Sequence, residues 1–309
     1  MSYPPSNFGR NSVGQLKLDC LNQAKSMETL STQMNHFLKR KVFYFNKKAE
    51  AIQSGFKAFD ENLSGFYRGE LTFIAARPGN GLYLVLNNLA INQSVNYAKK
   101  VLYFTIDFSG PELSGIIAEQ LTGKRLTRRW ESFSDKSEKK QLKSLPATLA
   151  DCLFFIEDQC FNIQSVLRKA KQVEALHGLD MIIVDDLTAI SKTAEGEFFR
   201  ERRTAEMLND LAQSLNLPIV IGVNLTKSNL IRNKGDDSIS LPSLNELNDM
   251  SILNYAGKFI LLHCPDYYLK GGQQPDHTCQ VIVTELTTNR MDTLTFKFDY
   301  IKGLLNEMA

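Results

Sequence analysis

The chain has 309 residues, of which 43% are hydrophobic and 23% are charged, and it carries neither an internal repeat nor a low-complexity tract. This composition suits one globular domain of about 250 residues with an extension. Lys and Arg total 36 against 34 Asp and Glu, for a formal charge of +2. No chain-wide positive field therefore favours a polyanionic partner, and any nucleic-acid binding must be local.

Cysteine usage and hydropathy bear on the compartment. The five cysteines form no C-x-x-C motif, and the first residues, MSYPPSNFGRNS, lack the apolar core of a signal peptide. We therefore expect a protein of the reducing cytoplasm. No apolar run approaches the roughly 18 residues of a membrane span, so we expect no membrane partner. The cysteines are Cys20, Cys152, Cys160, Cys264 and Cys279.

The N-terminal part differs from the rest of the chain. Residues 12–40 carry apolar positions at helical spacing, and the following stretch, KVFYFNKKAEAIQSGF, is mixed and basic. We predict a helical arm and linker over residues 1–50 and a single domain over residues 51–309. A polar helix of this kind is as often a solvated surface as a docking surface.

From Leu71 onward, short apolar runs alternate with amphipathic stretches. This alternation predicts an α/β fold with a mostly parallel central sheet flanked by helices. Three further runs follow one another without room for helices, which predicts an antiparallel extension at the C-terminal end. The predicted strands are 71–76, 101–106, 153–157, 181–186 and 218–223, the predicted helices lie near 82–98, 111–121, 162–177 and 196–215, and the final runs are 259–264, 279–285 and 293–298.

Two of the final runs bring together residues that could resemble a zinc site. His263 and Cys264 close one run, and His277 and Cys279 open the next. Neighbouring residues on a strand point to opposite faces, however, and the spacing is not that of a standard zinc finger. We expect no metal here, with the cysteines in the core and the histidines on the surface.

A glycine-rich turn follows the first predicted strand and leads into a helix, in the order typical of a phosphate-binding loop. In a working loop, Lys follows the last glycine and holds the phosphates, and the next residue is a Ser or Thr that holds Mg²⁺. Leu82 and Tyr83 stand there instead, and neither can replace these groups in the same geometry. The remaining backbone N–H groups could bind an anion weakly, and an ordinary turn is an equally good interpretation. The turn comprises Arg77, Pro78, Gly79, Asn80, Gly81, Leu82 and Tyr83.

The segment SGFKAFDENLSGFYRGELTFIAARPGNGLYL resembles the start of the RecA-like motor domain of the DnaB replicative helicase family, whose loop typically reads AARPSMGKT. The resemblance continues in order through VLYFTIDFSGPEL, HGLDMIIVDDLTAI, LNLPIVIGVNLTKS and LLHCPDYY, and it spans residues 54 to about 300. It implies a RecA-like P-loop NTPase fold, which the family uses for ATP-dependent helicase activity.

The resemblance also implies catalytic roles for three positions, Asp107, Asp185 and Asn224. In the family, a Glu that activates the attacking water matches Asp107, and a Gln that senses the γ-phosphate matches Asn224. Both residues are one methylene shorter here, and the shorter Asp107 would hold the water out of line. Asp185 keeps the acidic position that the family associates with Mg²⁺.

A basic pair that the family supplies in trans falls on Glu285 and Thr287, with Arg290 as a substitute only if its loop is reshaped. Loss of a trans Arg alone is worth about 10³ to 10⁵ in rate, and loss of one preorganised donor about 10² to 10³. The chain contains no GK[ST] motif anywhere. We therefore expect ATP hydrolysis to be lost or severely impaired, with no cofactor beyond weak binding of ATP and Mg²⁺.

In the family, DNA-contacting loops follow the sensor strand. The matching stretch here, TKSNLIRNKGDDSISLP, has three cations and two carboxylates and a net charge of only +1. We predict contacts with single-stranded DNA through Lys227, Arg232 and Lys234, and a solvated loop is the alternative.

Three functional hypotheses remain open. The first is a DnaB-like fold retained for assembly, as a homo-oligomer through residues 12–40, or for nucleic-acid binding in DNA replication. The second is an active but unconventional DNA-dependent ATPase that uses Arg77 and Asp107. The third is a non-catalytic partner of a true replicative helicase.

Overall fold

The computed structural model describes most of the chain beyond residue 49 and a few residues before it. The chain divides into two compact units, Met1–Ala49 and Glu50–Ala309. In the first unit, residues 30–32, 34, 35 and 38 are helical, and the remainder of the predicted arm lies outside the described residues. The described residues are 29–32, 34, 35, 38, 50–123, 136–191, 201–226, 240–269, 274–286, 290–299 and 302–308.

A single sheet organises the second unit. Within the described residues it has nine strands in the order β3-β2-β4-β5-β1-β6-β7-β8-β9. The first six in this order are parallel, and β7, β8 and β9 are antiparallel to their neighbours. The strands are β1 (Leu71–Ala76), β2 (Val101–Thr105), β3 (Phe154–Glu157), β4 (Met181–Asp185), β5 (Ile219–Asn224), β6 (Ala256–His263), β7 (Thr278–Glu285), β8 (Arg290–Asp299) and β9 (Leu304–Glu307).

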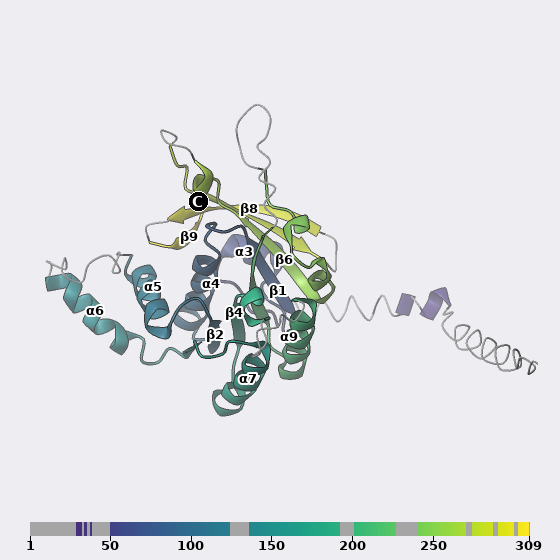
Figure 1. The fold of residues 1–309 in the computed structure, drawn as a ribbon, viewed down its shortest axis with the longest axis horizontal. Coiled ribbons are helices and arrows are strands. Elements are labelled where there is room, and N and C mark those ends of the chain that lie inside the picture. The colour runs from purple at the N-terminus through teal and green to yellow at the C-terminus, as the bar shows by residue number, and fades with distance from the viewer. Residues whose placement is uncertain are drawn as a thin grey trace, which may run out of the picture. The chain divides into compact units, whose positions relative to one another are not determined.

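Helices cover both faces of the sheet, with α4 and α5 on one side and α7 and α9 on the other (Figure 1). No described helix is long and apolar enough to cross a membrane. The α-helices are α3 (Lys57–Leu63), α4 (Leu82–Ile91), α5 (Gly110–Thr122), α6 (Lys136–Thr148), α7 (Ile163–His177), α8 (Leu187–Ile190) and α9 (Glu201–Leu215). A π-helical turn, η1 (Asn92–Asn96), extends α4, and 3₁₀ turns occur at η3 (Leu244–Glu246), η4 (Met250–Tyr255) and η5 (Pro265–Tyr268).

Strand β1 lies at the centre of the sheet, between β5 and β6. All six of its residues are buried, as expected for a parallel strand covered on both faces. Phe73 and Ala75 pack in the cluster with α7 and α9, whereas Ile74 and Ala76 pack in the cluster with α4 and α5. The two faces of β1 therefore join two hydrophobic cores.

Local signals explain the best-defined helix. Asn162 precedes α7 and accepts a hydrogen bond from the Ser165 N–H at 3.0 Å, and Gly178 follows its end with φ of 69°. Both are standard helix boundaries. The predicted boundaries of α7 are thus correct to one residue.

The predicted α/β architecture with an antiparallel C-terminal extension is confirmed. The prediction did not include α3, α6, α8, the three 3₁₀ turns or the last strand, β9. The predicted helix at 196–215 begins at Glu201 in the described part, and residues 192–200 lie outside it. In the sheet order, the six strands from β3 to β6 are parallel. The residues that follow their carboxyl ends therefore lie at the same edge of the sheet.

Candidate functional site

The glycine loop connects β1 to α4 at this edge. Gly79 and Gly81 have φ of 84° and 76°. These values lie in the left-handed region, which residues other than glycine rarely adopt. A Cβ on Gly79 would lie 2.0 Å from the Tyr267 ring, and one on Gly81 would lie 2.9 Å from the Phe298 ring. Two aromatic rings of the chain itself therefore rest on the loop.

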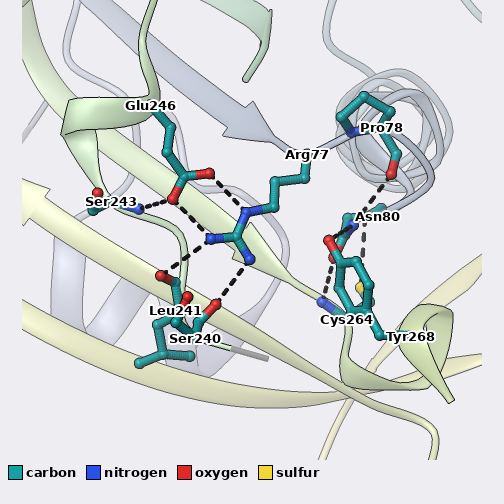
Figure 2. A network of polar contacts seen from close by, with 9 residues as sticks. All are labelled: Arg77, Pro78, Asn80, Ser240, Leu241, Ser243, Glu246, Cys264 and Tyr268. Carbon is teal, nitrogen blue, oxygen red and sulfur yellow. Dashed lines mark hydrogen bonds and ion pairs between the residues drawn. The ribbon is translucent and has the colours of Figure 1, made fainter. Parts of the chain in front are cut away.

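Asn80, between the two glycines, is buried and binds the segment after β6 (Figure 2). Its Oδ1 accepts the Cys264 N–H at 2.8 Å, and its Nδ2 donates to the Tyr268 hydroxyl at 2.8 Å. The Cys264 thiol also donates to the Asn80 carbonyl, at 3.4 Å between sulfur and oxygen. The loop is thus held to the end of β6 by hydrogen bonds on both sides of one residue.

Arg77 is buried and forms a two-pronged ion pair with Glu246 (Figure 2). Its Nε and Nη2 donate to the two carboxylate oxygens at 2.7 and 2.8 Å. Nη1 and Nη2 also donate to the carbonyls of Ser240 and Leu241, at 2.8 and 3.4 Å. Glu246 accepts a further bond from the Ser243 N–H at 3.0 Å. The Arg77 guanidinium is therefore directed toward η3 and is engaged there.

Leu82 and Tyr83, the first two residues of α4, make mainly apolar contacts. Leu82 is buried in the core, and its Cδ2 lies 3.4 Å from where a Cβ on Gly222 of β5 would be. The Tyr83 ring packs on Phe108, with centroids 5.2 Å apart. Burial, and to a lesser extent Glu119 and Asp185, raise the pKa of Tyr83, so this phenol stays neutral.

Asp185 and Asp186 are buried at the end of β4. The Asp185 Oδ2 accepts the Tyr103 hydroxyl at 3.0 Å. Asp186 caps α8 by accepting the Ala189 N–H at 2.8 Å, and its other oxygen accepts the Asn224 side-chain N–H. Asn224, at the end of β5, is thus positioned by Asp186.

Burial and the neighbouring Asp186 raise the pKa of Asp185 to about 7, and burial also raises the pKa of Asp186. Asp107, exposed beyond the end of β2, adds to both shifts. The three predicted catalytic positions therefore meet at one edge, where carboxylates crowd one another. Among the described residues no group of three or more His, Cys, Asp or Glu is arranged to hold a metal ion.

The histidines and cysteines of the C-terminal runs separate as strand geometry requires. Cys264 and Cys279 are buried side by side, and His277 is exposed. The prediction of a surface position was wrong for His263, which is only 3% exposed. Burial and the Arg77 guanidinium lower its pKa to about 4, so it is a neutral core side chain stacked on Tyr268.

The structure does not place all of the predicted residues. Lys227, Arg232, Lys234 and Thr287 lie outside the described residues. Glu285 ends β7 and Arg290 begins β8, where the two pair in register.

Sequence reasoning missed Glu246, Tyr267 and Tyr268. The two tyrosines directly follow a buried strand, and that position at the carboxyl edge was the available signal. Glu246 gave no such signal, because nothing in its local sequence identifies Arg77 as a partner 169 residues away.

Comparison with known proteins supports the family resemblance. The profile of the family described as "DnaB-like helicase C terminal domain" matches residues 51–302. The chain is 24% identical over 260 residues to the replicative DNA helicase DnaB of Geobacillus stearothermophilus, covering 80% of this chain and 54% of that protein. It is 22% identical over 307 residues to a probable plasmid replicative DNA helicase of Chlamydia psittaci, covering 98% and 65%. The chain therefore spans a little over half the length of the relatives it matches.

Solved structures share the same architecture. An isolated ATPase domain superposes with a TM-score of 0.74 at 15% identity, and the match covers 92% of this chain and all of that domain. A DnaB-like replicative helicase, described together with its interactions with primase, superposes with a TM-score of 0.74 at 16% identity, covering 96% of this chain and 75% of that one. At these identities the likeness establishes the fold, which is RecA-like.

We expect Arg77→Met to lower the free energy of unfolding by about 3 to 5 kcal/mol, because it leaves the Glu246 carboxylate buried without its partner. The double variant Arg77→Met, Glu246→Met should lose less than this single variant. Arg203→Met is the control, because Arg203 forms an exposed pair with Glu206 and its loss should change the free energy of unfolding far less. Urea unfolding measures all three, and equal losses at Arg77 and Arg203 would contradict the assignment.

Asp185 should make the protein less stable as pH rises. The ordinary pKa of Asp is 3.8, and the folded value is about 7. The native state therefore retains a proton between these values, and this contribution to stability is lost as pH rises toward 7. We expect Asp185→Asn to flatten this slope and to be more stable than the parent at pH 8, by up to about 4 kcal/mol. Exposed Asp210→Asn is the control, and identical pH profiles for parent and Asp185→Asn would refute the prediction.

Proposed function

Because this chain belongs to the DnaB-like helicase C-terminal domain family, we propose that it acts in DNA replication as a helicase-fold protein whose ATP hydrolysis is lost or severely impaired. The fold is retained for assembly or nucleic-acid binding. The observation that carries the proposal is that Leu82 and Tyr83 occupy the positions of the phosphate-binding Lys and the Mg²⁺-binding hydroxyl and pack against apolar groups.

The cover over the glycine loop supports the same proposal. Phosphate binding requires backbone N–H groups that a ligand can approach closely. Here the Tyr267 ring rests on Gly79, and the Phe298 ring rests on Gly81. A nucleotide that approached the loop from the side of these rings would have to displace at least one of them, which would lower its affinity.

The charges at this edge also disfavour nucleotide binding. Asp107, Asp185 and Asp186 lie near one another at the ends of β2 and β4. In an ATPase, a metal ion and a Lys neutralise the phosphates beside such carboxylates. A triphosphate without them would face repulsion, and the nearby Arg77 is directed to Glu246. This engagement disfavours the second hypothesis, an unconventional ATPase that uses Arg77.

For assembly, we propose that residues 12–40 form a helical arm that docks on another subunit. Leu30, Met34 and Leu38 recur every four residues in helical segments of this arm and are exposed in the single chain. Such a stripe is typical of a helix that packs against a partner. The partner is a second copy of this chain or, under the third hypothesis, a true replicative helicase.

We predict that single-stranded DNA binding is modest and falls steeply with salt. The predicted contact loop has only three cations that can displace counterions from the DNA. Fluorescence anisotropy over a series of salt concentrations measures this. Neutralising Lys227, Arg232 and Lys234 together should abolish binding, while neutralising Lys140, Lys143 and Lys171 should not. Binding that survives the first triple substitution would exclude the loop as the site, and no binding by the parent at low salt would favour the third hypothesis.

The sharpest test restores the missing groups. We expect the parent to bind ATP and Mg²⁺ no more tightly than in the high micromolar range. Leu82→Lys with Tyr83→Thr should tighten binding, and adding Tyr267→Ala should tighten it further by uncovering Gly79. None of these variants should turn over, because hydrolysis also needs a positioned water and a cation in trans.

Calorimetry and phosphate release measure the two properties separately. Leu82→Met with Tyr83→Phe is the matched control, which changes the same positions without adding charge or a short hydroxyl. Low-micromolar, Mg²⁺-dependent binding by the parent would refute the proposal. Turnover near one per second in the Lys and Thr variant, within the enzyme range of about 1 to 10³ per second, would show that the catalytic residues are wrongly assigned.

A further inference from the structure

Two cysteines lie opposite each other where β6 and β7 meet. The register of this antiparallel pair matches His263 with Gln280. The next pair of residues beyond it is Cys264 and Cys279. Their sulfur atoms are 3.1 Å apart, and both side chains are fully buried. Cys152 and Cys160 are the other cysteines in the described part of the chain, and neither lies on β6 or β7.

The backbone at this position already suits a disulfide bond. Residues directly opposite in an antiparallel pair have Cα atoms about 4.5 to 5.5 Å apart. Disulfides require about 4.4 to 6.8 Å. Closing the gap between the two sulfurs to a bond of about 2.0 Å needs only a rotation of the side chains. Oxidation would therefore not require β6 and β7 to separate.

The same two residues are connected to the glycine loop. The Cys264 N–H donates to the Asn80 side chain at 2.8 Å, and the Cys264 thiol donates to the Asn80 carbonyl at 3.4 Å. A disulfide has no S–H group, so the second of these bonds cannot exist in the oxidised state. Asn80 would then lose the bond at its carbonyl oxygen and keep its side-chain bonds to the Cys264 N–H and the Tyr268 hydroxyl.

We propose that Cys264 and Cys279 form a reversible dithiol–disulfide couple, and that its oxidation by a small peroxide loosens the glycine loop. This inference is independent of whether the chain binds nucleotide or DNA. Because the pair is buried, the oxidant must be small or must act while the end of the β6–β7 ladder is transiently open.

The chemistry balances with hydrogen peroxide as the two-electron oxidant. The Cys264 thiolate attacks one peroxide oxygen and breaks the O–O bond, which yields a sulfenic acid and, after protonation, one water. The Cys279 sulfur then attacks the Cys264 sulfur and expels a second water. The two thiol protons end in the two waters. A dithiol reductant reverses the reaction.

The roles of the two sulfurs follow from their surroundings. The hydrogen bond with Cys264, and then burial, raise the pKa of the Cys279 thiol well above its ordinary value. A raised pKa makes Cys279 the poorer first nucleophile, so we assign the first attack to Cys264 and the resolving attack to Cys279.

The test treats the full chain with peroxide, traps the remaining thiols with an alkylating agent under denaturing conditions, and maps the peptides by mass spectrometry. We expect a cross-linked peptide that joins Cys264 to Cys279, 2 Da lighter than the sum of the two reduced peptides, and its loss on treatment with dithiothreitol. The variant with Cys20, Cys152 and Cys160 changed to Ser should form the same link. Cys264→Ser should lose it without accumulating a sulfenic acid, and Cys279→Ser should accumulate a sulfenic acid at Cys264 that dimedone traps.

Hydrogen exchange of the Gly79, Asn80 and Gly81 amides measures the coupling, and we expect a several-fold acceleration on oxidation. Unchanged exchange in fully oxidised protein would overturn the effect on the loop. Exchange in β6 and β7 also reports how often the ladder opens. The incubation with peroxide should last longer than the time in which the β6–β7 ladder opens, so that access to the sulfurs is not limiting. If both sulfurs can still be alkylated after it, the proposed couple does not exist.

Discussion

The buried ion pair between Arg77 and Glu246 fixes the geometry on which this edge of the protein depends. A charge pair removed from water stabilises a fold only when its remaining hydrogen-bonding groups are also satisfied. Arg77 donates to two carbonyls besides the carboxylate, and Glu246 accepts a backbone N–H from Ser243. The pair thereby joins the end of the central strand to η3. The start of the glycine loop is consequently held by the chain itself, with no phosphate needed to order it.

This arrangement also holds the rest of the glycine loop in place through contacts within the chain. Gly79 and Gly81 keep left-handed conformations, and Asn80 is bonded to the end of β6. Tyr267 and Phe298 pack where the glycines leave space. The loop is thus part of the core packing. The contacts that maintain its conformation contribute to the stability of the fold.

The sequence predicted most of the sheet because its strands are short, apolar and separated by amphipathic helices. It also identified the turn at Gly79, which follows such a strand, whereas the acidic position at Asp185 was identified through the family resemblance. It could not identify Glu246 as the partner of Arg77, because that contact depends on tertiary packing between distant segments. The burial of His263 was missed for a related reason: adjacent residues on β6 face opposite layers, and here both layers are covered.

The central place of β1 has a consequence for synthesis on the ribosome. Its residues 71–76 pair with β5 at 219–224 and with β6 at 256–262, so neither neighbour exists until at least 148 further residues have been made. At typical elongation rates of about 5 to 20 residues per second, this interval lasts roughly ten seconds or more. During that time the nascent chain carries a strand-forming segment that is apolar except for Thr72, with both edges open. The order of the strands thus exposes a segment that must be kept from pairing with other chains until β5 has been made.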